Sequence, residues 1–146
     1  MFIENNVLKK ENVLLGLPST TQEEAIRKAG QLLIDSGYVY EEYIEAMFAR
    51  EEIVSTYIGN GVAIPHGVGN ARDLIRNSGL VVLQYPNGIM YNGNETFLVI
   101  GISGKDNEHI KILSNIANQI GDLDKAKELW TSTDLDHVYN VFVNGQ

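Results

Sequence analysis

Three histidines are the side chains of this sequence best suited to chemistry at neutral pH. An imidazole with a pKa near ~6.5 can act as a nucleophile, an acid or a base in a cell. His66 stands between Pro65 and Gly67, at the end of a short apolar segment. Small residues let a ligand approach the backbone closely, and residues at strand ends commonly form sites. This setting favours a functional role for His66, although a loop histidine without a function fits the residue type equally well.

His109 and His137 have different settings. His109 falls in the first turn of a predicted helix, where unpaired backbone N–H groups attract anions such as phosphate. Taken alone, a capping or surface histidine is the simpler interpretation of His109. His137 belongs to the polar face of the last predicted helix, and we expect it to face solvent.

Arg50 closes an acidic predicted helix. A cation at a helix C-terminus interacts favourably with the helix dipole, and Glu51 and Glu52 are available as ion-pair partners. This is the structural interpretation of Arg50. The functional interpretation requires that the fold bring Arg50 to His66.

Several other chemistries lack their sequence motifs. The chain contains no cysteine, which excludes disulfides, thiolate zinc sites and cysteine nucleophiles. No His-x-x-His or His-Glu-x-x-His motif supplies further metal ligands, and no Gly-x-Ser-x-Gly elbow marks a serine hydrolase. Gly59 and Gly61 begin a dinucleotide-binding pattern, but Ile64 occupies the position of its third glycine. The sequence therefore predicts no metal and no nucleotide cofactor.

The elements that must position these residues follow from hydrophobic periodicity and capping residues. The expected helices are residues 22–36 after a cap within 19–21, 41–50, 108–120 after a cap at Asp106 or Asn107, 124–130, and a last helix capped by Thr133 with Asp136. A short strand at 62–64 precedes His66, and continuous apolar runs at 80–85 and 96–102 predict central strands covered on both faces. Turn residues between the two long runs leave room for an edge hairpin around 89–91.

Alternating helices and buried strands predict an α/β fold. We expect a single layered domain over residues 1–146, with a mixed, mostly parallel sheet flanked by helices on both faces. The 11 Lys and Arg against 19 Asp and Glu give a net charge of −8, which argues against nucleic-acid partners. No signal peptide is visible, and no run reaches the ~20 apolar residues of a membrane span. The composition thus predicts a cytoplasmic protein without direct membrane insertion.

Two neighbouring segments carry a resemblance to a known family. Residues 49–52, Ala-Arg-Glu-Glu, and residues 55–67, Ser-Thr-Tyr-Ile-Gly-Asn-Gly-Val-Ala-Ile-Pro-His-Gly, stand close together in the chain. They resemble the active-site stretch of enzyme IIA domains of the fructose/mannitol class in the bacterial sugar phosphotransferase system. Residues 84–88, Gln-Tyr-Pro-Asn-Gly, and 107–110, Asn-Glu-His-Ile, are similar to the mannitol branch in particular. The resemblance runs from about Leu14 to Val143 and implies a type 2 IIA domain, a mixed sheet flanked by helices.

The resemblance implies a phosphotransferase that carries phosphate on a histidine. His66 would accept a phosphoryl group from the phosphohistidine of the phosphocarrier protein HPr, and would pass it to a cysteine on the IIB domain of the mannitol permease. His109 matches the histidine that hydrogen-bonds the phosphoryl group, and Arg50 matches the arginine that stabilises its charge. Both reactants are protein side chains, so no metal, nucleotide or other cofactor is implied. We expect His66, His109 and Arg50 to meet in one shallow, exposed depression with an apolar rim.

Two questions stay open at this point. The chain begins at Met1 and ends shortly after its last predicted helix, so we expect a free-standing IIA protein. Mannitol follows only from the resemblance to one branch, because a IIA domain does not bind sugar. The alternative function is that of a regulatory IIA-like protein, which controls partner proteins through phosphorylation of His66. An inert structural domain would require the His66 segment to be accidental.

Overall fold

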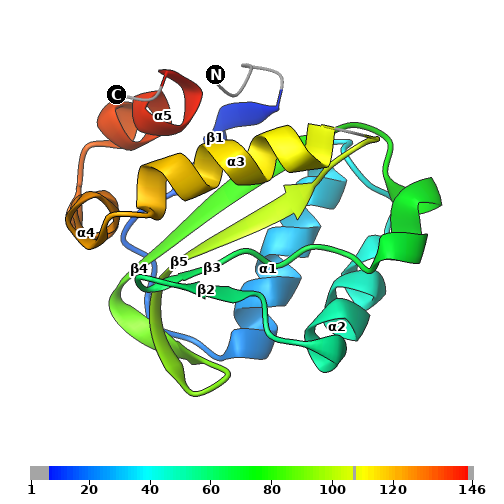
Figure 1. Cartoon of the computed structure of the whole chain (residues 1–146), viewed down its shortest axis with the longest axis horizontal. Coiled ribbons are helices and arrows are strands. Elements are labelled where there is room, and N and C mark those ends of the chain that lie inside the picture. Colours follow the sequence, from blue (N-terminus) through cyan, green and yellow to red (C-terminus); the bar gives the residue numbers. More distant parts are fainter. Residues whose placement is uncertain (1–6, 107, 145–146) are drawn as a thin grey trace.

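The computed structural model of the chain describes residues 7–106 and 108–144. Within these residues, five strands form one sheet in the order β1-β4-β5-β3-β2 (Figure 1). The strands are β1 (Leu8–Leu14), β2 (Tyr57–Gly59), β3 (Val62–Ala63), β4 (Gly79–Tyr91) and β5 (Asn94–Ser103). The helices are α1 (Gln22–Asp35), α2 (Tyr43–Ile53), α3 (Glu108–Ile120), α4 (Leu123–Thr131) and α5 (Leu135–Asn144), with a 3-10 helix, η1, at Gly69–Leu74.

The sheet is mixed, as predicted. β1 pairs with β4 and β3 with β5 in parallel, whereas β2 with β3 and β4 with β5 are antiparallel pairs. Each antiparallel pair is joined by an Asn-Gly turn, at residues 60–61 and 92–93, with positive φ at both turn residues. Asn and Gly tolerate this left-handed backbone, which a two-residue type I′ hairpin requires.

Helices cover both faces of the sheet. Figure 1 shows α3 crossing one face, with α1 and α2 behind the other. Along β4, Leu80 and Val82 belong to the core that includes residues of α3, α4 and α5, whereas Val81 and Leu83 belong to the core formed with α1 and α2. Successive strand residues point to opposite faces, so a strand covered on both sides is apolar throughout. The predicted layered α/β fold is confirmed.

Two strand predictions need correction. β1 was not expected, because it is an edge strand with exposed Lys10 and Glu11 in its middle and therefore has a weak apolar pattern. The expected edge hairpin around residues 89–91 is not a separate element, because residues 79–91 form one central strand whose end pairs with residues 94–96. The pairing of β4 with β5 is irregular between Gln84 and Ile89. This irregularity accommodates Pro86, which cannot donate a ladder hydrogen bond.

Helix boundaries differ from the prediction in smaller ways. α2 continues to Ile53 instead of ending near Arg50. The side chain of Asp134, and not that of Thr133, caps α5, since its Oδ1 accepts the N–H of His137 at 3.2 Å. Asn107, one of the expected caps of α3, lies outside the described residues. No helix in the described parts of the chain is long and apolar enough to cross a membrane.

Candidate active site

His66 lies where the short strand β3 meets the end of β5. Its backbone forms an isolated parallel bridge with Ile102, whose N–H donates to the carbonyl of Pro65 at 3.0 Å. Proline fixes its own φ and has no N–H to donate, so the strand pairing ends here and the chain turns outward. The imidazole of His66 is consequently half-buried at the edge of the sheet.

The two nitrogens of His66 have different surroundings. Nδ1 lies 2.7 Å from the carbonyl oxygen of Ile64, and a carbonyl only accepts, so Nδ1 carries the proton of the neutral ring. Nε2 then holds the lone pair. Burial lowers the pKa of His66 below its usual 6.5, and the charges of Arg50 and His109 act in the same direction against the Ile64 carbonyl and Glu51. The neutral, nucleophilic form is therefore favoured at cell pH.

Tyr43 of α2 holds the segment that follows His66. Its hydroxyl accepts the N–H of Gly67 at 2.9 Å and donates to the carbonyl of Ile102 at 2.8 Å. Burial raises the pKa of Tyr43 to about 12, so the hydroxyl stays protonated and can donate. A Cβ at position 67 would lie 2.7 Å from Cε1 of Tyr43. Glycine is therefore required for this close approach.

His109 lies in the first turn of α3, with its ring centroid 5.5 Å from that of His66 and the two planes 58° apart. Gly104 makes this placement possible, because a Cβ there would lie 2.5 Å from Cα and Cβ of His109. Nε2 of His109 is buried and has no hydrogen-bond partner. A buried polar atom without a partner is costly, and a ligand in the depression beside the rings can supply the missing hydrogen bond.

Both rings line one depression of about 480 Å³. Tyr43 and the exposed Arg72 and Asp106 also contribute to its walls. In the described parts of the chain, no group of three His, Cys, Asp or Glu side chains is arranged to hold a metal ion. The depression thus presents both imidazoles and the charged side chains of Arg72 and Asp106 to one space.

Arg50 lies in the last turn of α2 and is not among the residues that line this depression, where we expected it together with His66 and His109. Its Nη1 donates to the carbonyl of Val54 at 2.7 Å, and among the described residues it forms no ion pair with Glu51 or Glu52. Its positive charge lowers the pKa of His66, which places the guanidinium within electrostatic reach of that ring. This electrostatic influence is what the structure shows of a link between Arg50 and His66, and the functional interpretation of Arg50 stays a prediction.

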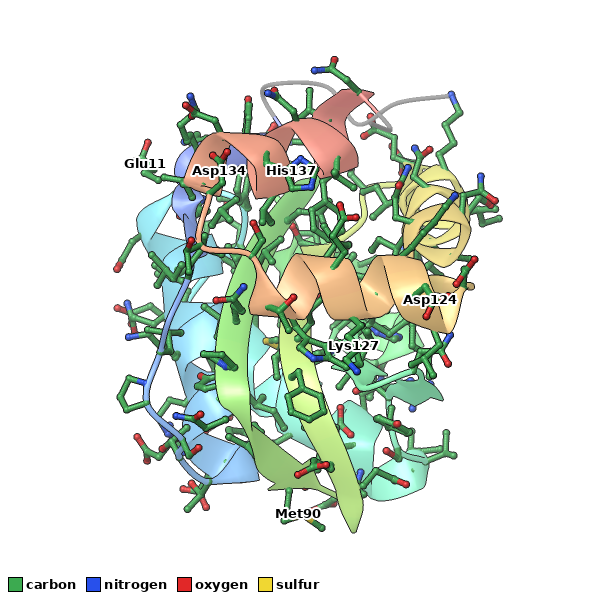
Figure 2. All side chains as sticks on the ribbon, turned by 90° about the vertical axis from the view of Figure 1, so that its left-hand side faces the viewer. Glu11, Met90, Asp124, Lys127, Asp134 and His137 are labelled. Atoms are coloured by element: carbon green, nitrogen blue, oxygen red, sulfur yellow. The ribbon has the colours of Figure 1, made fainter. Side chains whose placement is uncertain are left out.

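The third histidine does not line the depression. His137 lies on α5 next to α4 (Figure 2), where its Nε2 is 2.7 Å from Oε1 of Glu128. Its side chain is 37% exposed. The prediction that His137 faces solvent is therefore correct only in part, since an inter-helix contact also holds it.

Exposed apolar side chains accompany the site residues. Val54, whose carbonyl holds Arg50, is 57% exposed, and Ile110, which follows His109, is 68% exposed. Ile53 at the end of α2 is 71% exposed. Isolated surface apolar residues are common, but these three stand next to the groups that would act on a ligand.

Sequence reasoning missed Tyr43 as a site residue. Its position on the apolar stripe of α2 indicated a core residue, and it is indeed only 2% exposed. The hydroxyl was the available signal, because a buried tyrosine oxygen normally has a hydrogen-bond partner. Its partners lie 24 and 59 residues away in the chain, so the sequence alone could not identify them.

The chain is similar in sequence and in fold to known proteins. Residues 6–145 match the family model described as "Phosphoenolpyruvate-dependent sugar phosphotransferase system, EIIA 2". The mannitol-specific phosphotransferase enzyme IIA component of Bacillus subtilis (strain 168) is 53% identical over 112 residues, covering 76% of this chain and 78% of the relative.

A longer relative and a solved structure extend the comparison. The PTS system mannitol-specific EIICBA component of Vibrio cholerae is 42% identical over 142 residues, which is 95% of this chain but 22% of that component. This chain therefore spans about a fifth of that relative's length. The IIA structure in the complex of enzyme IIAMTL with phosphorylated enzyme IIBMTL from Escherichia coli superposes with a TM-score of 0.87 at 37% identity, covering 96% of this chain and 100% of that chain. The chain belongs to the EIIA 2 family of the phosphoenolpyruvate-dependent sugar phosphotransferase system.

Proposed function

We propose that this chain is a mannitol IIA phosphocarrier, formed as one domain over residues 1–146, that carries phosphate on His66. HPr would donate the phosphoryl group from its phosphohistidine, and a cysteine of the IIB domain of a mannitol permease would accept it. The observation that carries the proposal is the pair of imidazoles: Nε2 of His66 holds a lone pair, and Nε2 of His109 is buried without a partner nearby.

The chemistry of the carrier step needs only protein side chains. The lone pair of His66 Nε2 attacks phosphorus, the bond from phosphorus to the HPr nitrogen breaks, and that nitrogen keeps the electron pair. In the second transfer a IIB thiolate attacks the same phosphorus, and Nε2 of His66 leaves with its electron pair. No water is consumed and no phosphate is released.

His109 and Arg50 would stabilise the charge of the transferred group. With its proton on Nε2, His109 donates to a phosphoryl oxygen and so satisfies its own buried nitrogen. Arg50 supplies a fixed positive charge beside His66, and oriented charges of this kind stabilise transition states in phosphoryl transfer. Positioning and electrostatics together account for the activity.

Mannitol as the sugar rests on the relatives. The Bacillus subtilis relative carries the mannitol-specific name at 53% identity, and the Escherichia coli structure joins a mannitol IIA protein with its phosphorylated IIB partner. By analogy, a mannitol IIB domain is the proposed acceptor. Because this chain would receive its phosphate from HPr, we propose that it acts in the cytoplasm, with no direct membrane insertion.

Reconstitution of the transfer tests the carrier function. Incubation with phosphoenolpyruvate, enzyme I and HPr should attach one phosphate that is labile in acid and stable in base. His66→Ala should abolish the labelling, because it removes the nucleophile. His137→Ala is the matched control and should be labelled like the wild-type protein, since His137 pairs with Glu128 away from the site. Labelling retained in His66→Ala would refute His66 as the carrier.

A second assay tests the sugar. The phosphorylated chain should transfer its phosphate faster to the IIB domain of a mannitol permease than to the IIB domain of a fructose permease. Equal rates would contradict the mannitol assignment. A phosphorylated chain that donates to no IIB domain would instead favour the regulatory alternative, in which phosphorylated His66 controls partner proteins.

A further inference from the structure

Glu51 is a carboxylate that the proposed chemistry does not use, although it is the neighbour of Arg50. Tyr91 donates its hydroxyl proton to Oε2 at 2.7 Å, and the hydroxyl of Thr56 donates to the same oxygen. Oε1 accepts the N–H of Thr56 at 3.1 Å and the amide of Asn92 at 3.4 Å. A negative charge in the last turn of a helix opposes the helix dipole, and these four donors offset that cost.

Thr56 links this carboxylate to His66. Thr56 is 3% exposed, and both its N–H and its hydroxyl are committed to Glu51. Its carbonyl accepts the N–H of Ile64 at 3.0 Å. The carbonyl of Ile64 in turn lies 2.7 Å from Nδ1 of His66. A continuous path of short contacts therefore runs from Glu51 to the imidazole.

The same segment leads to Arg50. Val54 stands two residues before Thr56, and its carbonyl accepts Nη1 of Arg50 at 2.7 Å. When Thr56 is fixed on Glu51, the Val54 carbonyl has little freedom to move, because each residue contributes only two soft dihedrals. Arg50 and Glu51, which are adjacent in α2, thus hydrogen-bond to Val54 and Thr56 in the segment that follows the helix.

We propose that Glu51 is a positioning residue: by anchoring Thr56, it sets the carbonyl that selects the His66 tautomer and the carbonyl that holds Arg50. Only the tautomer with the proton on Nδ1 has a lone pair on Nε2. If the Ile64 carbonyl moves away, the proton redistributes between the two nitrogens and fewer rings can attack phosphorus. The inference rests on the proposed role of His66 and adds a residue that acts through it.

The test compares Glu51→Gln with Glu52→Gln. Glutamine at position 51 keeps the shape but replaces one acceptor oxygen with a donor, which then faces hydrogens of Thr56 or Tyr91. Glu52 is exposed, and the substitution Glu52→Gln removes the same charge from the same helix end. The pair of variants therefore separates the hydrogen-bonded anchor from the net charge of this region.

Two readouts decide the outcome. ¹⁵N NMR of the His66 ring in the unphosphorylated protein reports the tautomer ratio, and stopped-flow assays report the transfer rate from phosphorylated HPr. In Glu51→Gln we expect a smaller fraction with the proton on Nδ1 and transfer slowed on the order of 10- to 100-fold, as small displacements of reacting groups produce. Glu52→Gln should match the wild-type protein in both. A wild-type tautomer ratio in Glu51→Gln would overturn the proposal, whatever the transfer rate.

A milder variant covers the case in which Glu51→Gln does not fold. Thr56→Val removes the hydroxyl that donates to the carboxylate and leaves the backbone N–H of residue 56 on Oε1, so it should shift the tautomer ratio in the same direction but less. An unchanged ratio in folded Thr56→Val would then overturn the proposal. The ratio is measured without phosphate, so it stands apart from the proposed function, which fails if the wild-type protein is not labelled on His66.

Discussion

At the scale of single residues, the central feature is His66, whose two ring nitrogens have different surroundings. The Ile64 carbonyl holds the proton on Nδ1 of His66, and burial lowers the pKa of the ring. Both effects favour a neutral ring with its lone pair on Nε2. In the proposed transfer, His66 would therefore need no separate general base to remove a proton before it attacks phosphorus.

The lowered pKa of His66 makes stability depend on pH. The unfolded chain, with an ordinary pKa near ~6.5, takes up a proton before the folded protein does. The contribution of His66 to the free energy of unfolding is therefore fully present above pH ~6.5. It is lost as the pH falls from there through the lower pKa of the folded state. Chemical denaturation at pH 8 and pH 5 should show a larger loss of unfolding free energy in the wild-type protein than in His66→Gln. An equal loss in both would show that His66 is not the group responsible.

Arg50→Lys separates a catalytic cation from a helix-end charge. Lysine keeps the charge but loses the planar fork of donors. If Arg50 stabilises the transferred phosphoryl group, transfer from phosphorylated HPr should slow on the order of 10²-fold. Thermal unfolding should hardly change, since a helix-end cation contributes only about 0.3–1 kcal/mol and lysine retains it. Stopped-flow and melting measurements on the same sample check both values. Unchanged transfer with a lower melting temperature would make Arg50 structural.

The site residues differ in how far the sequence reveals them. His66, His109 and Arg50 were predicted as site residues because a family resemblance joined them, whereas their types and settings alone left a structural interpretation open. Tyr43 could not be identified, because its hydroxyl contacts a residue 59 positions away. The proposed role of Glu51 depends on how Thr56 is placed against Ile64, which the sequence does not reveal. Helical periodicity predicts which face of α2 is buried, but it does not predict which polar atoms hydrogen-bond to the side chains on that face.

At the scale of elements, the site depends on how closely α3 approaches the end of β5. Gly104 lies between them, with room for no Cβ beside His109. Tyr43 fastens α2 to the same strand end through Ile102. Two helices from opposite faces of the sheet thus meet at one strand end, and each brings one part of the site.

Gly104→Ala should push the first turn of α3 away from His66. The added Cβ would lie 2.5 Å from Cα and Cβ of His109, and overpacking of this kind costs about 1–3 kcal/mol of stability. Transfer should slow on the order of tenfold or more as the two rings separate. Melting and stopped-flow transfer check the two effects. Wild-type transfer in this variant would show that the spacing of the two imidazoles is not important.

The sequence predicted the strands that are buried on both faces of the sheet, and it did not predict the partly exposed strand at the edge. β4 and β5 are covered on both faces, so their continuous apolar runs identified them. β1 carries exposed charges at the sheet edge and gave no such pattern. Pro86 and the residues after it indicated a turn, but the structure absorbs them as an irregularity within β4, because the pairing with β5 resumes at Ile89.

At the scale of the whole molecule, the sheet brings together residues from distant parts of the chain. His66 follows β3 and His109 belongs to α3, and the parallel pairing of β3 with β5 brings His66 to the strand end beside which His109 lies. Arg50, on α2, acts on His66 through its charge. The resulting depression is open at the surface and lined by both rings. Such a site suits exchange of a phosphoryl group between protein side chains.

The most direct test is to locate the phosphate on the intact protein. Uniformly ¹⁵N-labelled chain, phosphorylated with phosphoenolpyruvate, enzyme I and HPr, is examined by ¹H–¹⁵N NMR for ³¹P coupling to ring nitrogens. The predicted result is a single coupled nitrogen, Nε2 of His66, with the proton still on Nδ1 beside the Ile64 carbonyl. Coupling on Nδ1 of His66, on His109 or on His137 would contradict the assignment of His66 Nε2 as the phosphate carrier.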